Sequence, residues 1–343
     1  VFWCVLAGFV LLRDQPIARW SCATLLMAIL VWWGWSPRTH WEPGKLRVTF
    51  LDVGQGDATV LELPDGQTVL IDGGPAYRRL DMGRAVIGPY LWNRGIHRID
   101  HVIATHPQWD HVGGLPWVLQ AFDVGAYWSN GIPRSRAFYK RLQTAVGTAE
   151  LDEQVGVAGT DIIESGPCSL AVLSPSAKKK SMKLVSAEEI SGKDLNNRSL
   201  VTRLDCGSHS MLLTADAEQE VLAQLQRLPH GHSAKIVKVP HHGAKSSLHK
   251  GWVKLIEAEA MVVSVGSHNR YGHPAAEVVA AYAERGLPLY RTDHDGAIII
   301  EASLDSPDLR ITTTQQQQLV PVDLSKNIWR QEWANWQRLW NSR

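Results

Sequence analysis

The chain has 343 residues, of which 45% are hydrophobic and 20% are charged, and its formal net charge at pH 7 is +1. This balance excludes an intrinsically disordered chain and shows no global basic excess of the kind that indicates nucleic-acid binding. The length allows one sizeable domain with an appendage.

Two apolar runs open the chain, at residues 1–12 and 20–35. The second run ends in tryptophans, which favour the membrane interface. Because a full span needs roughly 20 apolar residues, we expect residues 1–36 to be transmembrane segments that end a longer, polytopic channel domain. A linker at residues 37–45 would follow. Two buried core helices are the alternative interpretation.

Charges between the two apolar runs predict an orientation. If Arg13 and Arg19 lie in a cytoplasmic loop, the positive-inside rule places the rest of the chain on the outer side. We therefore predict a multi-pass protein of the inner (cytoplasmic) membrane, with the following domain on its periplasmic or outer side. The missing N-terminal part of the same polypeptide and the membrane are then partners of that domain.

From residue 45 onward, short β-rich runs alternate with helical patterns. The predicted strands are residues 46–53, 59–63, 69–72, 102–105, 200–204, 211–216, 235–240, 261–266 and 297–301. Helical periodicity is found at residues 217–228 and 274–285, the latter with Pro274 at a plausible first position. Residues 175–197 are polar and predict a loop. The interleaved elements indicate a layered α/β fold.

Two further segments complete the organisation. Cys168 and Cys206 imply neither a disulfide framework nor a cysteine zinc site, although one bridge between them is a second interpretation. Four tryptophans near the end recur at intervals of four, three and four, at residues 329, 333, 336 and 340. We predict an amphipathic helix there, which packs against the domain or, alternatively, lies at the membrane interface.

The strongest chemical signal is the run Thr105–Gly114, which follows an apolar strand. His106, Asp110 and His111 place nitrogen and oxygen donors for a divalent cation at this strand end. The run resembles the H-x-[HDQ]-x-D-H signature of the metallo-β-lactamase superfamily. That resemblance implies an αββα sandwich, which here would be preceded by transmembrane helices.

Two later strand ends match the same superfamily. Asp216 ends the segment Leu212–Asp216, where the superfamily has a carboxylate that bridges two metals, and Val239–Gly243 carries the pair His241 and His242. The resemblance implies a site formed by Asp110, His111, Asp216 and one of the paired histidines, with His242 favoured. His106 and the same Asp216 would begin a second site.

Further motifs along the chain narrow the resemblance from the superfamily to one family. They are Leu51–Asp57, Asn196–Val201, Val239–Ser246, Ser264–Pro274 and Arg291–Asp293. Together with the metal run they resemble the C-terminal metallo-β-lactamase-like domain of the ComEC competence proteins, over residues 46–303. Residues 304–343 would then be a C-terminal extension. In that family the domain follows the last transmembrane segments of a channel that imports DNA during natural transformation.

Departures from the broader superfamily bear on the metal. Gln108 occupies the place of a second histidine, and the only histidine between His111 and Asp216 is His209, in a predicted turn. Asn196, Asn197 and Ser199 stand near that place instead. Oxygen donors suit harder ions, so we expect Mn²⁺ or Mg²⁺, with Zn²⁺ as the alternative, and one or two ions.

The expected reaction is hydrolysis of a phosphodiester by metal-activated water. Asp110 would hold and orient the nucleophile, and one of His241, His268 or His273 would offset charge or protonate the leaving alkoxide. Asp52, Asp57 and Asp72 close strands nearby, where support of the ligands is favoured over direct coordination. A further five lysines, Lys235, Lys238, Lys245, Lys250 and Lys254, suggest a phosphate track.

The ComEC resemblance implies a nuclease that degrades the strand of DNA that is not imported, without sequence preference. Its partners would be DNA and the uptake machinery, such as a DNA receptor. Two alternatives stay open at this point: a phosphodiesterase acting on another substrate, such as a phosphorylcholine-type esterase, and a catalytically inactive module that only binds the strand.

Overall fold

The computed structural model describes residues 20–21, 24–25, 27, 42–176 and 190–315. The membrane segments predicted at 1–36 lie almost wholly outside these residues, and so does the tryptophan-rich helix predicted near the end of the chain. In the described ranges, no helix is long and apolar enough to cross a membrane.

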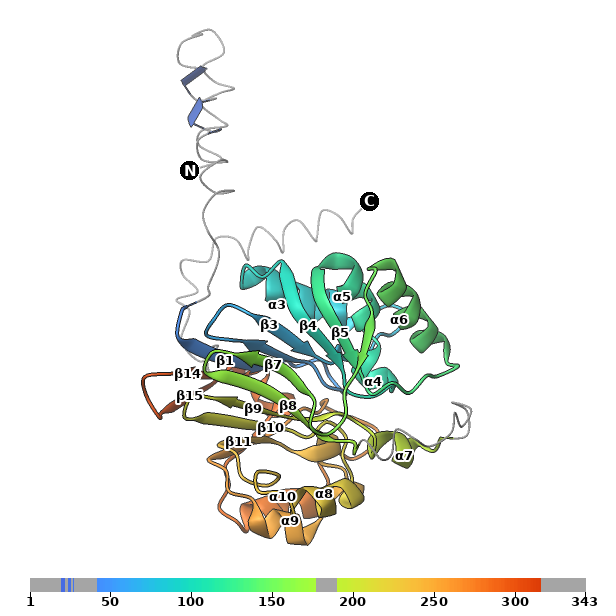
Figure 1. Ribbon diagram of the computed structural model, residues 1–343, viewed down its shortest axis with the longest axis vertical. Helices are drawn as coiled ribbons and strands as arrows, with labels where there is room; N and C mark the ends of the chain where they lie inside the picture. The colour runs from blue at the N-terminus through green and yellow to red at the C-terminus, as the bar shows by residue number, and fades with distance from the viewer. Residues whose placement is uncertain (1–19, 22–23, 26, 28–41, 177–189, 316–343) are drawn as a thin grey trace, which may run out of the picture. The chain divides into compact units, whose positions relative to one another are not determined.

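The strands form two sheets (Figure 1). The eight-stranded sheet has the order β15-β14-β1-β2-β3-β4-β5-β6, and the seven-stranded sheet has the order β13-β12-β11-β10-β9-β8-β7. The strands of the first sheet are β1 (Lys45–Phe50), β2 (Thr59–Glu62), β3 (Thr68–Ile71), β4 (Arg98–Ala104), β5 (Asp123–Ser129), β6 (Glu153–Val155), β14 (Ile298–Ser303) and β15 (Leu309–Thr313). Those of the second are β7 (Asp161–Ser165), β8 (Cys168–Ser174), β9 (Val201–Cys206), β10 (His209–Leu213), β11 (Ile236–Lys238), β12 (Ala260–Val263) and β13 (Leu289–Arg291).

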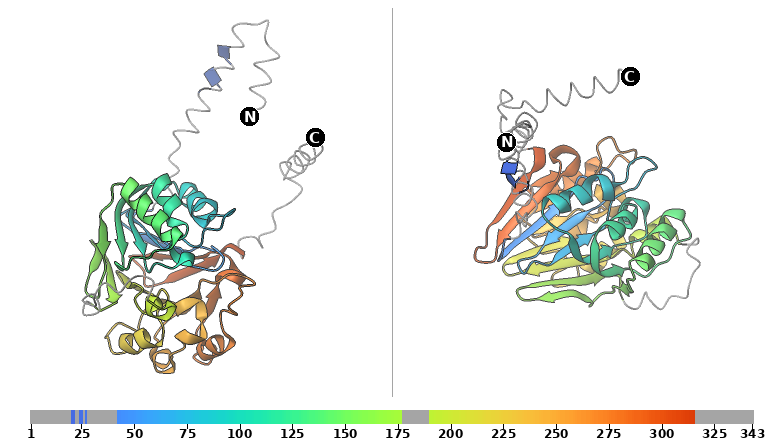
Figure 2. Two further views of the ribbon diagram at one scale, coloured as in Figure 1. Left: turned by 90° about the vertical axis from the view of Figure 1, so that its right-hand side faces the viewer. Right: turned by 90° about the horizontal axis from the view of Figure 1, so that it is seen from above.

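Helices lie on the outer side of each sheet, as both views in Figure 2 show. The elements on the side of the first sheet are η1 (Gly83–Ile87), α3 (Gly88–Asn93), α4 (Trp109–Val112), α5 (Leu115–Ala121) and α6 (Ala137–Thr148). Those that follow in the second half are α7 (Gly192–Asn196), α8 (Gln219–Leu225), η3 (Pro240–Gly243), η4 (Lys245–Ser247), α9 (Lys250–Leu255), α10 (Ala276–Ala283) and α11 (Thr292–Asp295).

Three apolar layers explain this arrangement. Val48 of β1 and Met211 of β10 belong to the cluster that fills the space between the sheets. Leu115 of α5 packs in a second cluster outside the first sheet, and Val221 of α8 packs in a third outside the other. Strands β2 and β3 are buried on both faces. Three of the four residues of β3 are therefore apolar, whereas β2 ends in Glu62, which accepts a hydrogen bond from Tyr90. The predicted αββα sandwich is therefore confirmed.

The structure corrects several predicted boundaries. The sheet continues past residue 303, because β15 pairs with β14 in a hairpin. Helix α7 lies within the segment predicted as a loop, and α10 starts after Pro274, with Ala275 as its N-cap. The chain between residues 123 and 174 holds elements for which no prediction was made, because β5 and β7 alternate weakly between buried and exposed positions.

A disulfide joins the two cysteines of the second sheet. Cys168 of β8 lies directly opposite Cys206 of β9 in the antiparallel register, and their sulfur atoms are bonded. The single bridge that the sequence left open is therefore present.

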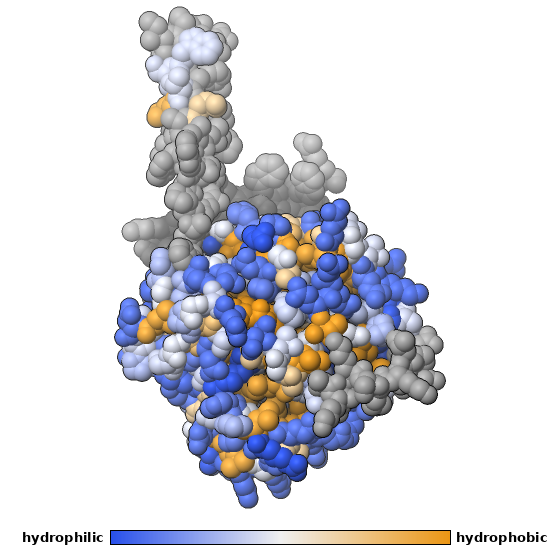
Figure 3. Space-filling view, viewed as in Figure 1, coloured by the Kyte–Doolittle hydropathy of each residue, from blue (hydrophilic) through white to orange (hydrophobic). Residues whose placement is uncertain are grey.

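Much of the face shown in Figure 3 is hydrophilic, and apolar residues are exposed there in separate patches.

Candidate metal centre

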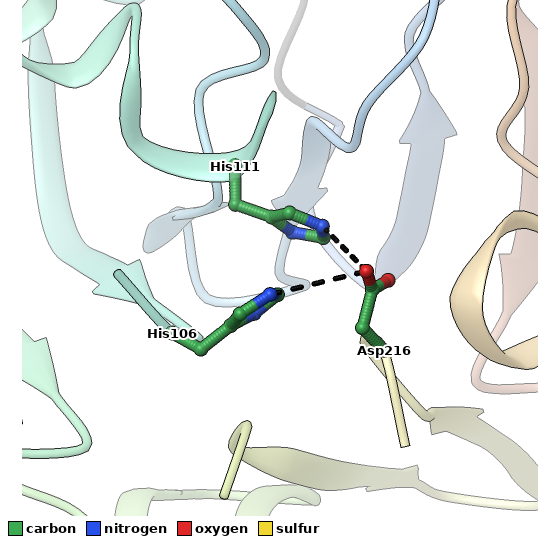
Figure 4. A group of neighbouring side chains, drawn as sticks. All are labelled: His106, His111 and Asp216. Atoms are coloured by element: carbon green, nitrogen blue, oxygen red, sulfur yellow. Dashed lines mark ion pairs between the residues drawn. The ribbon is translucent and has the colours of Figure 1, made fainter. Parts of the chain in front are cut away.

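The predicted ligands come together because they follow the carboxyl ends of strands from both sheets. His106 and His111 follow β4, Asp216 follows β10, and His242 follows β11. Strands β10, β11 and β12 run parallel, so the segments that leave their carboxyl ends emerge at one edge of the sheet. Figure 4 shows the rings of His106 and His111 directed at the carboxylate of Asp216.

Distances around Asp216 define the centre of the cluster. Its Oδ2 lies 3.2 Å from Nε2 of His111 and 3.9 Å from Nε2 of His106. Its Oδ1 lies 3.6 Å from Nε2 of His242, which is also 3.6 Å from Oδ2 of Asp110. We call Asp110, His111, Asp216 and His242 the inner set. Asp110, His111 and His242 place ligand atoms within 4.8 Å of one another, as a metal site requires, and so do His106, His111 and Asp216.

Hydrogen bonds to Nδ1 fix the tautomer of each histidine. Nδ1 of His242 lies 2.8 Å from the backbone oxygen of Ser264, which can only accept, so this nitrogen donates. Nδ1 of His111 lies 2.7 Å from Oδ2 of Asp72 and donates in the same way. The neutral form of each ring therefore has its lone pair on Nε2, the atom that faces the cluster. Burial lowers the pKa of both rings, but Asp216 outweighs it and raises them, so that a proton occupies this position until a cation displaces it.

His106 acquires the same tautomer through a relay. The hydroxyl of Thr105 donates to Oδ2 of Asp72 at 2.8 Å, so its oxygen is free to accept from Nδ1 of His106 at 3.1 Å. Asp72 thus orients two rings at once. An outer carboxylate that holds a ligand histidine is a common support of metal sites.

Unsatisfied polar atoms indicate that the cluster is built for a cation. Within the described ranges, Nε2 of His106, His111 and His242 and both carboxylate oxygens of Asp216 are buried without a hydrogen bond. Each such atom costs about 1–3 kcal/mol when nothing binds it. Lone pairs of nitrogen and carboxylate oxygen that converge in this way fit a divalent cation.

A buried ion pair lies next to the inner set. Nζ of Lys238 lies 2.7 Å from Oδ2 of Asp57, and both side chains are at most 4% exposed. Oδ1 of Asp57 lies 3.6 Å from Nδ1 of His242. Asp57 and Asp72 also belong to groups that could hold a cation, both of them with His111, so their predicted supporting role stays a prediction beside direct coordination. Asp52 is exposed and accepts only from the backbone of Gly54 among the described residues.

Backbone conformation aims the side chains. Asp72, Ala215, His241 and His242 all have positive φ, between 46° and 61°, which is uncommon for residues with a Cβ. Such residues cluster at functional sites, where the surrounding structure holds them. Gly56 also has positive φ, and a Cβ there would lie 2.1 Å from the backbone oxygen of Asp110, so only glycine allows this loop to pack against the metal run.

A second group of side chains lies beside the inner set and is satisfied by its own hydrogen bonds. Gln108 donates to Oδ1 of Asn196, whose amide donates to Oε1 of Glu218 at 2.9 Å. That carboxylate lies 3.4 Å from Nδ1 of His241, and Nε2 of His241 lies 3.6 Å from Asp216. We call Gln108, Asn196, Glu218 and His241 the outer set. Gln108 and Asn196 stand where the superfamily has histidines or close to it, and their side-chain amides hydrogen-bond to each other.

Electrostatics separates the roles of the buried groups. Burial and the neighbouring His111 lower the pKa of His106 to about 3, so its ring is neutral. Burial raises the pKa of Asp110, but the nearby rings of His242 and His111 outweigh it and give about 2. Burial likewise opposes ionisation of Asp216, but His242 and His111 lower its pKa well below the usual range. Both carboxylates are therefore ionised at neutral pH.

The three histidines proposed as catalytic have different positions. His241 is 20% exposed and touches Asp216. The ring of His273 lies 5.8 Å from that of His241 and is half-buried. Burial, with His241 next, lowers its pKa to about 4. His268 is exposed and has no hydrogen bond or ion pair to any described residue, so the structure does not bring it to the cluster.

Two lysines and one histidine have other roles than the sequence predicted, and one site residue was not predicted at all. Lys238 is buried and paired with Asp57, and Lys245 pairs with Glu277, so neither is a free member of a phosphate track. His209 lies in β10 with Nε2 2.9 Å from the backbone oxygen of Ser303, as a core residue. Glu218 was not singled out, although its position two residues after Asp216 is a signal for a site residue.

Comparisons with known proteins agree with the fold. Residues 51–137 match the Metallo-beta-lactamase superfamily. The chain is 28% identical over 264 residues to ComE operon protein 3 of Bacillus subtilis and 26% identical over 295 residues to competence protein ComA of Neisseria gonorrhoeae. These alignments cover 73% and 86% of this chain but 32% and 37% of those proteins, so the chain spans about a third of their length.

Among solved structures, Igni18, a metallo hydrolase from the archaeon Ignicoccus hospitalis, aligns with a TM-score of 0.46 and 13% identity, over 74% of this chain and 98% of that one. The curated relatives are ComEC family members, and the resemblance drawn from the sequence motifs is thereby confirmed.

Proposed function

From its similarity to the ComEC competence proteins, we propose that this chain is a metal-dependent nuclease that hydrolyses phosphodiester bonds of DNA. The observation that carries the proposal is the inner set, where buried nitrogen and carboxylate lone pairs converge without hydrogen-bond partners. His106, His111, Asp110, Asp216 and His242 would hold the cation. We propose Mn²⁺ or Mg²⁺ as the ion, with Zn²⁺ as the alternative that the three imidazoles suit.

A divalent cation bound there polarises a phosphoryl oxygen and makes water reactive near neutral pH. Around it, the ionised Asp110 accepts a hydrogen bond from the attacking water and orients it. His241 reaches the cluster through Nε2, and its partly exposed ring can donate a proton to the leaving alkoxide. Oε1 of Glu218 lies 3.4 Å from the opposite ring nitrogen, Nδ1, and would orient the ring.

We further propose that the domain works on the outer side of the cytoplasmic membrane, as part of a longer channel protein that imports one strand of DNA. The disulfide between Cys168 and Cys206 supports this side, because disulfides persist in oxidising compartments. Degradation of the other strand, contact with a DNA receptor and the preceding membrane segments belong to the same proposal.

The test incubates the purified chain with single-stranded and duplex DNA in Mn²⁺, Mg²⁺ or Zn²⁺, beside Asp110→Ala and Asp216→Ala. We expect the parent to cleave DNA in Mn²⁺ or Mg²⁺ and both variants to be inactive. DNA that survives in every metal, while a phosphorylcholine ester is cleaved, would assign the site to another phosphodiesterase. Binding of DNA without cleavage of either substrate would assign a strand-binding module.

A further inference from the structure

An aromatic pair lies next to the metal run and has no part in the hydrolytic steps. The ring of Tyr77 packs edge-on against that of Trp109, with centroids 4.5 Å apart. Trp109 directly precedes Asp110, and its Nε1 donates to the backbone oxygen of Ala76 at 2.9 Å. The pair is therefore fixed beside a residue of the inner set.

A second aromatic pair reaches the cluster from the loop after β12. Tyr271 stacks on His273, with centroids 5.7 Å apart and an interplanar angle of 19°. His273 in turn contacts His241 of the outer set. The guanidinium of Arg270 lies 5.0 Å from the centroid of the Tyr271 ring and donates to its hydroxyl at 3.0 Å.

Each pair borders the metal donors, Tyr77 and Trp109 beside Asp110 and Tyr271 through His273 and His241. The pKa of Tyr77 is raised by burial first and then by the charges of Asp110 and Tyr271, while Arg270 lowers it. Tyr77 therefore lies within electrostatic reach of the inner set and of the loop after β12. We call Tyr77, Trp109, Arg270 and Tyr271 the aromatic rim.

The aromatic rim is exposed, yet its second loop is held in place. Tyr77 is 48% exposed and Tyr271 is 54% exposed, so neither ring serves mainly to fill the core. Oδ1 of Asn269 accepts from the backbone nitrogens of Tyr271 and His273, and its amide donates to the backbone oxygen of Gly266. The loop thus presents an exposed ring in a fixed orientation.

We propose that the aromatic rim binds unpaired bases of single-stranded DNA, with the scissile phosphodiester on the metal cluster and a neighbouring phosphate on Arg270. This inference rests on the proposed function and adds its substrate form. Bases in a duplex hide their faces in the stack, whereas unpaired bases can stack on tyrosine and tryptophan whatever their sequence. The guanidinium has five donors and uses one on Tyr271, so others can reach a phosphate.

The test compares three substrates: a short single strand, the same strand in a duplex, and the same strand with abasic sites around the cleaved bond. For each, kcat/KM is measured in Mn²⁺ for the parent, Tyr271→Ala, Tyr77→Ala and the matched control Trp92→Ala. Trp92 is also exposed, but its ring packs on Trp117 and Phe122. Binding of the labelled strand in EDTA gives a second readout that needs no turnover.

We expect the parent to prefer the single strand over both other substrates. Tyr271→Ala and Tyr77→Ala should each lower kcat/KM and affinity for the single strand about tenfold more than for the abasic strand, and Trp92→Ala should not change this ratio. Arg270→Ala should weaken binding of single and abasic strands alike and reduce its salt dependence.

Equal cleavage of duplex and single strand, or an equal loss on base-containing and abasic strands, would overturn the inference while leaving the nuclease proposal intact. Absence of DNA cleavage by the parent would instead overturn the proposed function. In that case, base-dependent binding in EDTA would still decide whether the aromatic rim holds unpaired bases.

Discussion

The inner and outer sets lie side by side and differ in how their polar atoms are satisfied. In the inner set, buried donors for a metal point at one another and find no hydrogen-bond partner among the described residues. In the outer set, Gln108, Asn196 and Glu218 form a chain of hydrogen bonds that ends at His241. The difference teaches that one half of the site needs a cation to be complete and the other half does not.

The largest effect should come from the carboxylate at the centre of the inner set. Asp216→Asn removes one negative charge and should lower phosphodiester hydrolysis more than about a thousandfold, because a bound cation contributes several kcal/mol to the transition state. Kinetics and the metal content of the purified chain measure this. The control Asp161→Asn changes an exposed carboxylate on β7. Full metal content in Asp216→Asn would contradict the assignment.

The support of the inner set predicts a large effect on stability. Lys238→Met leaves Asp57 buried without its partner and should lower the free energy of unfolding by about 3–5 kcal/mol. Denaturant unfolding measures the loss, and the double variant with Asp57→Leu should regain part of it. Lys245→Met breaks the exposed pair with Glu277, which solvent screens, and should leave the free energy of unfolding nearly unchanged. Similar costs for the two lysines would contradict the buried pair.

Orientation of the ligand rings predicts an intermediate effect. Asp72→Asn weakens the acceptor for Nδ1 of His111 and for the hydroxyl of Thr105, and should lower metal affinity about 10- to 100-fold. Calorimetric titration of the metal-free chain with Mn²⁺ tests this. Asp52→Asn, which changes an exposed carboxylate after β1, is the control. If the two variants bind Mn²⁺ equally well, Asp72 does not orient the ligands.

The smallest expected effect concerns the outer set and the number of cations that the site binds. The parent should bind one cation tightly, since the amides of the outer set are already paired. Gln108→His places an imidazole beside His106 and Asp216 and should raise the number of bound Zn²⁺ ions toward two, as elemental analysis can show. The control Gln120→His changes an exposed glutamine of α5. Two ions in the parent would remove the distinction between the sets.

Local patterns were enough to predict much of the architecture. Apolar runs that end in Asp or His identified β3, β4, β10 and β11 and the residues that follow them, because a strand that is buried on both faces must be nearly continuous in apolar residues. Weakly alternating strands such as β5 and β7 were missed, since half of their residues are partly exposed and carry little pattern.

By itself, the sequence determined the αββα fold, the resemblance to the ComEC proteins and the strand ends that carry the metal donors. Only the tertiary structure decided that Lys238 is buried and paired with Asp57, that Gln108 donates to Asn196, and that Tyr77 and Tyr271 both border the metal donors. The physical reason is the separation along the chain over which each effect acts. Hydrophobic period and strand polarity act over a few neighbouring residues, whereas these contacts depend on how two sheets and their loops pack, which no local pattern records.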